Sequence, residues 1–441
     1  MRILYEFTAF RVFTDIVFLV VVFFVQRFWL RGALRHIRRV FPVRLRQVLQ
    51  GLWFLAVVFV TVVVLNSTFA RFLPRHGIST WILAGGKLWL AVSFLGFVGI
   101  KILRGADLLA ARALANIEPR RRARFDPARR EFFRYAGYLV GGLPIVVGTY
   151  GFFGERLEYR IRTVEIPIPG WPSALDGLRI VQLSDIHMSD FLPLREVRRA
   201  VEMAGALRGD IIVVTGDFIT AAHDPLVDCI AELSRLRAPL GVWGCNGNHE
   251  IYAKVEAKAQ SLFAQYGMRL LRQESAEIAW RGAKFNLLGV DYQRERPPFG
   301  KMRPMLTSIE SLIRKDIPNI LLSHNPNSFR RAAELGIELS LAGHTHGGQV
   351  QVEILDHSWN AANYMTDFVA GLYRLPLGVA EKPAGKDGDD ANDAAPPAMA
   401  AAPGAGKFAS IYVNRGLGTI GMPIRIGVPP EITLITLRSE N

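Results

Sequence analysis

The first third of the chain is dominated by four long apolar stretches that alternate with arginine-rich segments. Residues 47–70 and 135–154 contain no Asp, Glu, Lys or Arg, and residues 9–25 and 81–100 are almost as apolar. A helix rises about 1.5 Å per residue, so stretches of this length can cross a hydrocarbon layer of roughly 30 Å. The pattern predicts a membrane domain with about four transmembrane helices in residues 1–154.

Charged residues interrupt the first and third stretches. Arg11 and Asp15 lie in the first stretch, and Lys87 lies in the third. Because a charge inside a membrane is costly, Asp15 and Lys87 either pair within the helix bundle or lie near an interface. Buried core helices of a soluble domain are the alternative for all four stretches, but the alternation with arginine-rich loops favours a membrane domain.

After a polar connector at residues 155–177, the pattern changes to short apolar runs separated by amphipathic segments. Such runs are typical of buried strands, and they occupy 178–184, 211–216, 241–247, 285–290, 319–324 and 339–344, followed by ASIYVNR and EITLITL. Amphipathic segments at 194–207 and 226–236 lie between them. This alternation predicts an α/β sandwich over residues 178–441. Residues 378–407 are rich in Ala, Pro, Gly and Asp, which predicts a disordered insertion.

The positive charge of the chain is confined to its first part. The net charge is +14, but residues 1–162 hold 25 Lys and Arg against 8 Asp and Glu, and the remainder carries −3. The loops after the first and third apolar stretches are rich in arginine, whereas the loop after the second holds only Arg71 and Arg75. The positive-inside rule then predicts a multi-pass protein of the cell inner membrane whose C-terminal domain is periplasmic. The charge of that domain argues against a nucleic-acid partner.

Polar residues with metal-binding side chains follow the predicted strands, at the edge where open α/β sheets place their sites. Five of the nine histidines fall in these short motifs. The seven candidate ligands are Asp185, His187, Asp217, Asn248, His324, His344 and His346. A single Asp or His at a strand end is more often a cap, but a set of this size points to a shared site.

The residue types in this set narrow the chemistry. Imidazole together with carboxylate suits Mn, Fe, Zn or Co. Seven ligands are too many for one structural zinc ion, but they suit two divalent transition metal ions about 3.5–4 Å apart, which clamp a phosphoryl group and activate water. Two cysteines are too few for a Cys-based metal domain.

The order SDIH, GD, GNHE, SHNP and GHTHGG resembles the calcineurin-like metallophosphoesterase superfamily, and the late NRGLGTIGMPIRIGVPPEI resembles its bacterial membrane-associated YkuE- and YaeI-like branch. The resemblance implies an αββα sandwich with a binuclear site. It implies that Asp185, His187 and His346 hold one metal, that Asn248, His324 and His344 hold the other, and that Asp217 bridges them.

The resemblance also implies roles for two neighbouring residues. His249 is expected to act on the phosphoryl group as a catalytic residue, protonating the leaving oxygen, and Glu250 to orient His249. Two positions depart from the family pattern: Glu250 stands where many members have Asp, and Thr220 stands where many have an acid.

The expected function is hydrolysis of a phosphomonoester or phosphodiester by a metal-activated hydroxide. The membrane domain favours a lipid-linked or envelope phosphate ester by proximity alone. Three alternatives stay open: a nuclease of the same superfamily, a membrane sensor or scaffold whose phosphoesterase fold only binds, and a transporter built on Asp15 and Lys87.

A few further residues have weaker expectations. Asn325 and Arg415 lie near the motifs and could contact substrate, whereas Asp291 suits a structural role. Cys229 and Cys245 either form a disulfide or remain buried thiols.

Overall fold

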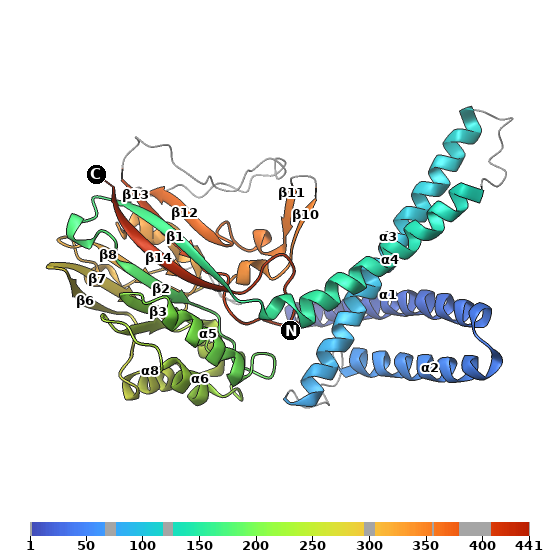
Figure 1. The fold of residues 1–441 in the computed structure, drawn as a ribbon, viewed down its shortest axis with the longest axis horizontal. Helices are drawn as coiled ribbons and strands as arrows, with labels where there is room; N and C mark the ends of the chain where they lie inside the picture. The colour runs from blue at the N-terminus through green and yellow to red at the C-terminus, as the bar shows by residue number, and fades with distance from the viewer. Residues whose placement is uncertain are drawn as a thin grey trace. The chain divides into compact units, whose positions relative to one another are not determined.

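The computed structural model describes residues 2–66, 76–117, 127–294, 305–354, 357–378 and 407–440. The chain divides into two compact units, Met1–Tyr150 and Gly151–Asn441. Each unit is described by itself below, with the element labels of Figure 1.

The first unit consists of four long helices, which are α1 (Arg2–Val40), α2 (Val43–Leu65), α3 (Ile78–Ile117) and α4 (Pro127–Phe153), the last ending in the second unit. Each is long and apolar enough to cross a membrane, over Val12–Val40, Val43–Leu65, Ile78–Ala113 and Ala128–Leu157. The prediction of four apolar helices is confirmed. Many large apolar side chains on them are exposed, among them Phe54 and Leu139, which suits contact with lipid.

Hydrogen bonds between polar side chains connect α1 to α3. Gln26 Nε2 donates to Ser93 Oγ over 3.1 Å, and Trp29 Nε1 donates to the Ser93 carbonyl over 2.9 Å. Within the part of the chain that the structure describes, Asp15 and Lys87 form no ion pair. The transporter alternative, which depended on that pair, therefore gains no support.

The second unit contains two six-stranded sheets (Figure 1). In spatial order, the first sheet is β1 (Arg160–Pro169), β14 (Glu431–Glu440), β2 (Arg179–Leu183), β3 (Ile211–Thr215), β4 (Val242–Cys245) and β5 (Arg269–Leu270). The second is β12 (Gly371–Pro376), β13 (Phe408–Val413), β9 (Leu339–Ala342), β8 (Asn319–Leu322), β7 (Ala283–Gly289) and β6 (Glu274–Trp280). The eight strands expected from apolar runs are all present.

The two sheets pack face to face as a sandwich, because alternate side chains along each strand point to opposite faces of the sheet. Ile180 and Val213 of the first sheet share a core cluster with Phe285 and Leu341 of the second. Their neighbours, such as Val181, belong to the cluster beneath α5 (Leu194–Ala206), α6 (Leu226–Leu233) and α8 (Glu256–Gln265). Helix α9 (Phe329–Glu334) packs with β13 on the second sheet. This is the αββα sandwich that the family resemblance implied.

The segment expected to be a polar connector is part of the sheet. Residues 160–169 form β1, which pairs in parallel with β14 from Arg160 to Pro169. Ile166 and Ile168 are buried on one face, whereas Ile161 is 48% exposed. The charged residues of an edge strand hid this alternation in the sequence. The second unit thus begins at Gly151 rather than at residue 178.

The predicted insertion at 378–407 falls almost entirely outside the described residues, which stop at Gly378 and resume at Lys407. The Leu377 N–H donates to the Lys407 carbonyl over 3.0 Å. The insertion therefore joins two neighbouring antiparallel strands, β12 and β13, and leaves their pairing intact.

Sheet topology gathers the motifs at one edge. Strands β2, β3 and β4 run parallel to one another, as do β7, β8, β9 and β13. The turns that carry the sequence motifs follow the carboxyl ends of these strands, and a hairpin of β10 (Gln351–Ile354) and β11 (His357–Asn360) follows the last motif.

Candidate metal centre

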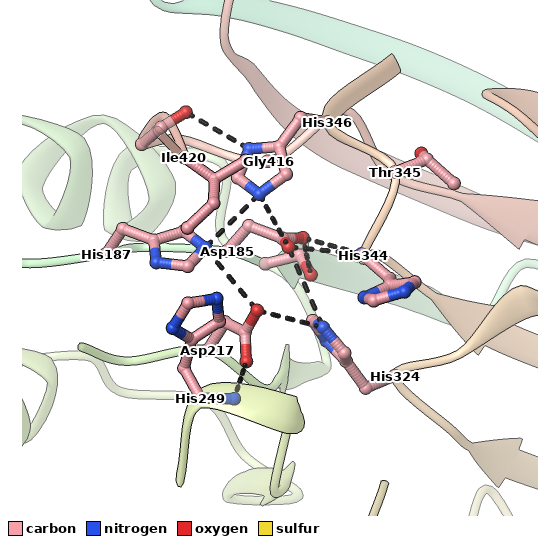
Figure 2. A network of polar contacts seen from close by, with 12 residues as sticks. Asp185, His187, Asp217, His249, His324, His344, Thr345, His346, Gly416 and Ile420 are labelled. Atoms are coloured by element: carbon pink, nitrogen blue, oxygen red, sulfur yellow. Dashed lines mark hydrogen bonds and ion pairs between the residues drawn. The ribbon is translucent and has the colours of Figure 1, made fainter. Parts of the chain in front are cut away.

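Histidine and aspartate side chains from both sheets converge at this edge (Figure 2). Their ligand atoms form three groups, each within 4.8 Å, which are Asp185, His187 and His346; His187, Asp217 and His249; and Asp217, His324 and His344. Six of the seven candidate ligands thus occur in these groups. The seventh, Asn248, begins helix α7 (Asn248–Ala253), directly after Gly247, which packs against Asp217.

Asp217 belongs to two of the three groups and lies between His187 and His324. Its Oδ2 is 3.4 Å from His187 Nε2 and 3.1 Å from His324 Nε2. Asp185 Oδ1 is 3.3 Å from His346 Nε2. Figure 2 shows the carboxylate of Asp217 between His187 and His324, which is the position that a bridging ligand requires.

Five of the seven candidate ligands have backbone angles in the left-handed region. The φ angles are 48° for Asp185, 48° for His187, 54° for Asp217, 76° for His344 and 52° for His346. A non-glycine residue in this region costs about 1–3 kcal/mol, and such residues cluster at functional sites. The turns are therefore shaped to aim side chains rather than to minimise local energy.

Two glycines make room for the carboxylates. A Cβ on Gly247 would lie 2.1 Å from Asp217 Oδ1, and a Cβ on Gly416 would lie 2.6 Å from Asp185 Cβ. Both distances are far below van der Waals contact, so these positions of the GNHE and NRG motifs exclude any side chain.

Each of four histidines is fixed through one ring nitrogen. The Nδ1 atoms lie 3.1 Å from Thr220 Oγ1 for His187, 2.6 Å from the Thr220 carbonyl for His249, 2.6 Å from the Thr215 carbonyl for His324, and 3.3 Å from the Gly418 carbonyl for His346. A carbonyl partner fixes Nδ1 as the donor and leaves Nε2 with a free lone pair, as in metal-binding histidines. Thr220, where the family pattern has an acid, serves both His187 and His249.

The unbalanced contacts in the centre fit a bound cation. His187 Nε2 and His346 Nε2 face each other at 3.2 Å. The Oδ1 atom of Asn248 is buried and accepts no hydrogen bond from any described residue. Facing imidazole nitrogens and an orphaned amide oxygen are costly without a cation nearby, so the residues present fit divalent transition metals.

The electrostatics of the centre also suit cations. Burial would lower the pKa of His324, but the carboxylates of Asp217 and Asp185 outweigh it and raise that pKa to about 10, so these carboxylates favour a positive charge at this position, whether a proton on the ring or a bound cation. Burial, with the charge of His324, lowers the pKa of His344 to about 3. Burial also holds the pKa of His346 well below its usual range, so this ring and that of His344 are neutral and able to bind metal.

Glu250 differs from its expected role. Its carboxylate accepts the N–H groups of Gly247 over 2.8 Å and of Asp217 and Phe218 over 2.9 Å each. Burial and the charge of Asp217 raise its pKa to about 7. Glu250 therefore holds the turn that carries Asp217, and the His249 ring is oriented by Thr220 instead.

A cavity of about 650 Å³ opens beside the centre. Its wall contains residues that the sequence motifs did not identify as candidate site residues. Tyr252, Tyr292 and Arg294 line it, and the Arg294 guanidinium donates to the Tyr252 hydroxyl. Of the two residues expected near substrate, Asn325 lines the cavity, whereas Arg415 lies 3.5 Å from Glu431.

Arg425 is a further residue that sequence reasoning missed. It is fully buried, and its Nη2 donates to the carbonyls of Gly418 over 2.6 Å, Arg415 over 2.9 Å and Gly416 over 3.1 Å. Gly418 N–H in turn donates to the Asp185 carbonyl over 2.7 Å. The sequence did not indicate a role for this arginine, because the backbone carbonyl groups that it contacts are brought together only in the folded chain.

The remaining expectations concern residues away from the centre. Asp291 accepts hydrogen bonds from Arg272 over 2.9 Å and Asn246 over 2.7 Å, which is a structural role. Cys229 and Cys245 are both buried free thiols, so the disulfide alternative is not observed.

Comparison with known proteins places the centre in a family. Residues 178–348 match the calcineurin-like phosphoesterase family. The chain is 28% identical over 322 residues to the metallophosphoesterase YkuE of Bacillus subtilis. The aligned region covers 71% of this chain and 99% of YkuE. It is 28% identical over 341 residues to the bovine transmembrane protein with metallophosphoesterase domain, covering 75% of this chain but only 66% of that protein.

A third relative carries a name with a substrate in it. UDP-2,3-diacylglucosamine pyrophosphatase LpxG of Chlamydia trachomatis is 26% identical over 348 residues, covering 66% of this chain and 93% of LpxG. The apolar helices and the transmembrane relatives together support a membrane location. The chain therefore carries a calcineurin-like metallophosphoesterase domain and is related to YkuE and to the transmembrane metallophosphoesterases of animals.

Proposed function

We propose that the second unit hydrolyses a phosphate ester with two divalent transition metal ions, Mn, Fe, Zn or Co. Asp185, His187 and His346 would hold one ion, and Asn248, His324 and His344 the other. The observation that carries this proposal is the position of Asp217, whose Oδ2 lies within 3.4 Å of a histidine nitrogen from each group. When bound, such ions supply positive charge for the phosphoryl oxygens and lower the pKa of water.

His249 is proposed as the proton donor to the leaving oxygen. Its Nδ1 contacts the Thr220 carbonyl, so Nε2 is the ring atom left for substrate. The residue lines the cavity and is half-buried, with its ring 4.7 Å from that of His187. A phosphate in the cavity would favour the protonated ring, because an adjacent negative charge raises the pKa of histidine.

The substrate proposed is a lipid-linked phosphate ester of the cell envelope. A cavity of about 650 Å³ exceeds the need of a phosphate group alone. Met365, which lines the cavity, is 75% exposed, and Tyr364 next to it in the chain is 82% exposed. Exposed apolar side chains at the rim suit acyl chains or a bilayer surface. The name of LpxG, which describes a diacylated substrate, supports the same class.

The arrangement in the cell is proposed to follow the arginine distribution. The arginine-rich ends of α1, α3 and α4 would lie in the cytoplasm, so the second unit would be periplasmic and the chain a multi-pass protein of the inner membrane. A nuclease gains no support, since the charge of the chain after residue 162 is −3.

The test is an activity panel on the full chain purified in detergent. Aryl phosphate monoesters and diesters, a lipid phosphate and a nucleotide sugar carrying acyl chains are compared after chelation and reloading with each metal. We expect activity that depends on Mn, Fe, Zn or Co and is highest on the acylated substrate. A chain that binds two metals but hydrolyses none of these esters would support the sensor alternative, and a chain that binds no metal would contradict the proposal.

A further inference from the structure

A second cavity, independent of the proposed reaction, lies within the first unit. It encloses about 660 Å³ and is lined by residues of α1, α2, α3 and α4. This volume is in the range of small-ligand sites, and the walls include the aromatic rings of Phe28, Trp29, Trp53 and Phe133.

The cavity has a basic end and an apolar end. On α1, Arg35 and Arg39 lie about 9 and 15 Å along the helix axis from Trp29. On α4, Arg134 lies about 16 Å along the axis from Ile145. Helix α3 contributes Arg104 and, one turn earlier, Ile100. The same polarity therefore occurs on three of the four helices.

Positive charge at the basic end exceeds the negative charge available there. The Asp107 carboxylate, which also lines the cavity, is 2.6 Å from Arg129, and Arg134 is 2.8 Å from Glu131. Arg35, Arg39 and Arg104 form no ion pair with a carboxylate of the described residues. The Arg104 guanidinium lies over the Phe28 ring at 5.5 Å, which keeps it beside the cavity.

A buried donor in the wall also lacks a partner. The indole Nε1 of Trp53 is buried and has no hydrogen-bond acceptor among the described residues. The indole of Trp29, in contrast, is satisfied by the Ser93 carbonyl. An unsatisfied buried donor is costly, and an ester or phosphate oxygen in the cavity would remove that cost.

We propose that this cavity binds one anionic phospholipid. Its phosphate would contact Arg35, Arg39 and Arg104, and an acyl chain would extend along Ile100 and Ile145. A soluble anion would leave the apolar end of the cavity unused, whereas a phospholipid matches both ends. Basic pockets between membrane helices are sites where anionic headgroups bind. The site would make the membrane unit a lipid-binding module as well as an anchor.

Native mass spectrometry of the full chain in detergent tests the proposal. The protein is incubated with phosphatidylglycerol or phosphatidylcholine. We expect phosphatidylglycerol to be retained at least about tenfold more strongly, and the triple variant R35Q/R39Q/R104Q to lose about tenfold or more of that binding. The matched control R44Q/R112Q/R130Q removes the same charge at exposed arginines outside the cavity and should stay within about twofold of the parent.

Three results would overturn the site. They are equal retention of phosphatidylcholine, an equal loss in the control variant, and displacement of the lipid by millimolar inorganic phosphate, which would indicate a soluble anion. Helix content by circular dichroism identifies a misfolded triple variant. In that case Trp53→Phe, which keeps every charge, provides the test: it should weaken phosphatidylglycerol binding by about threefold or more, and unchanged binding would contradict the proposal.

Discussion

His249 and Asp217 are neighbours at the metal centre, but their contacts differ. The Asp217 carboxylate faces histidine nitrogens on two sides and also accepts the His249 N–H over 2.9 Å. The His249 ring has a polar contact with the Thr220 carbonyl, packs beside the rings of His187 and Tyr252, and lines the cavity. His249 also belongs to one of the three possible ligand groups, so substitution must separate a proton donor from a ligand.

Replacing each residue by alanine should give different results. We expect His249→Ala to keep the metals and the fold and to lower turnover by about 10²–10⁴, because a general acid contributes that much. The loss should be smaller for a nitrophenyl ester, whose leaving oxygen needs no proton. Asp217→Ala should lose metal and activity together. Metal analysis and turnover measured on the same samples provide the check; loss of metal in His249→Ala would make His249 a ligand.

At the scale of elements, the centre is assembled from turns that follow parallel strands. The turn after β4 packs against the turn after β3 so closely that a Cβ on Gly247 would lie 2.1 Å from Asp217 Oδ1 and 2.6 Å from Asp217 N. Glu250 connects the same two turns through backbone N–H groups. The spacing between elements, rather than any single contact, therefore sets the position of Asp217.

A side chain at Gly247 should disturb that spacing. Gly247→Ala is expected to destabilise the second unit by about 1–3 kcal/mol, the usual cost of overpacking, and to reduce metal content. Gly205→Ala is the matched control, because a Cβ there meets nothing within 4 Å in helix α5 and alanine favours a helix. Thermal unfolding and metal analysis of both variants test the prediction. Equal metal content and stability in Gly247→Ala and the parent would show that the turns can move apart.

At the scale of the whole molecule, charge distinguishes the two units. Residues 1–150 hold 22 Lys and Arg against 6 Asp and Glu, which gives +16, and residues 151–441 hold 31 against 33, which gives −2. The arginines cluster at the ends of α1, α3 and α4, which is the pattern of cytoplasmic loops. Under the proposed orientation, arginine placement far along the chain from the candidate metal centre would set the side of the membrane on which that centre lies.

Reporter fusions at residue 440 test the orientation. An alkaline phosphatase fused there should be active, because it folds only outside the cytoplasm, and a cytoplasmic fluorescent reporter should be dark. Moving the arginine surplus to the loop after the second span should reduce that activity. The opposite pattern in the parent chain would place the metal centre in the cytoplasm and exclude a periplasmic substrate.

The sequence by itself determined the four apolar helices, the principal strands and the set of metal-binding residue types. These follow from local rules, because span length and strand burial are visible as runs of apolar residues. The edge strand β1 was not predicted, because its exposed charged residues are typical of a linker. Its pairing with β14 is visible only in the folded structure.

Only the tertiary structure decided how the side chains meet. In the folded chain, the Glu250 carboxylate accepts the Asp217 N–H, and the His249 ring contacts the Thr220 carbonyl. The guanidinium of Arg425 donates to backbone carbonyl groups. The tertiary structure also formed both cavities, whose walls come from segments far apart in the chain. Such contacts depend on the distance between elements, and that distance is set by packing across the whole core, which no local pattern in the sequence encodes.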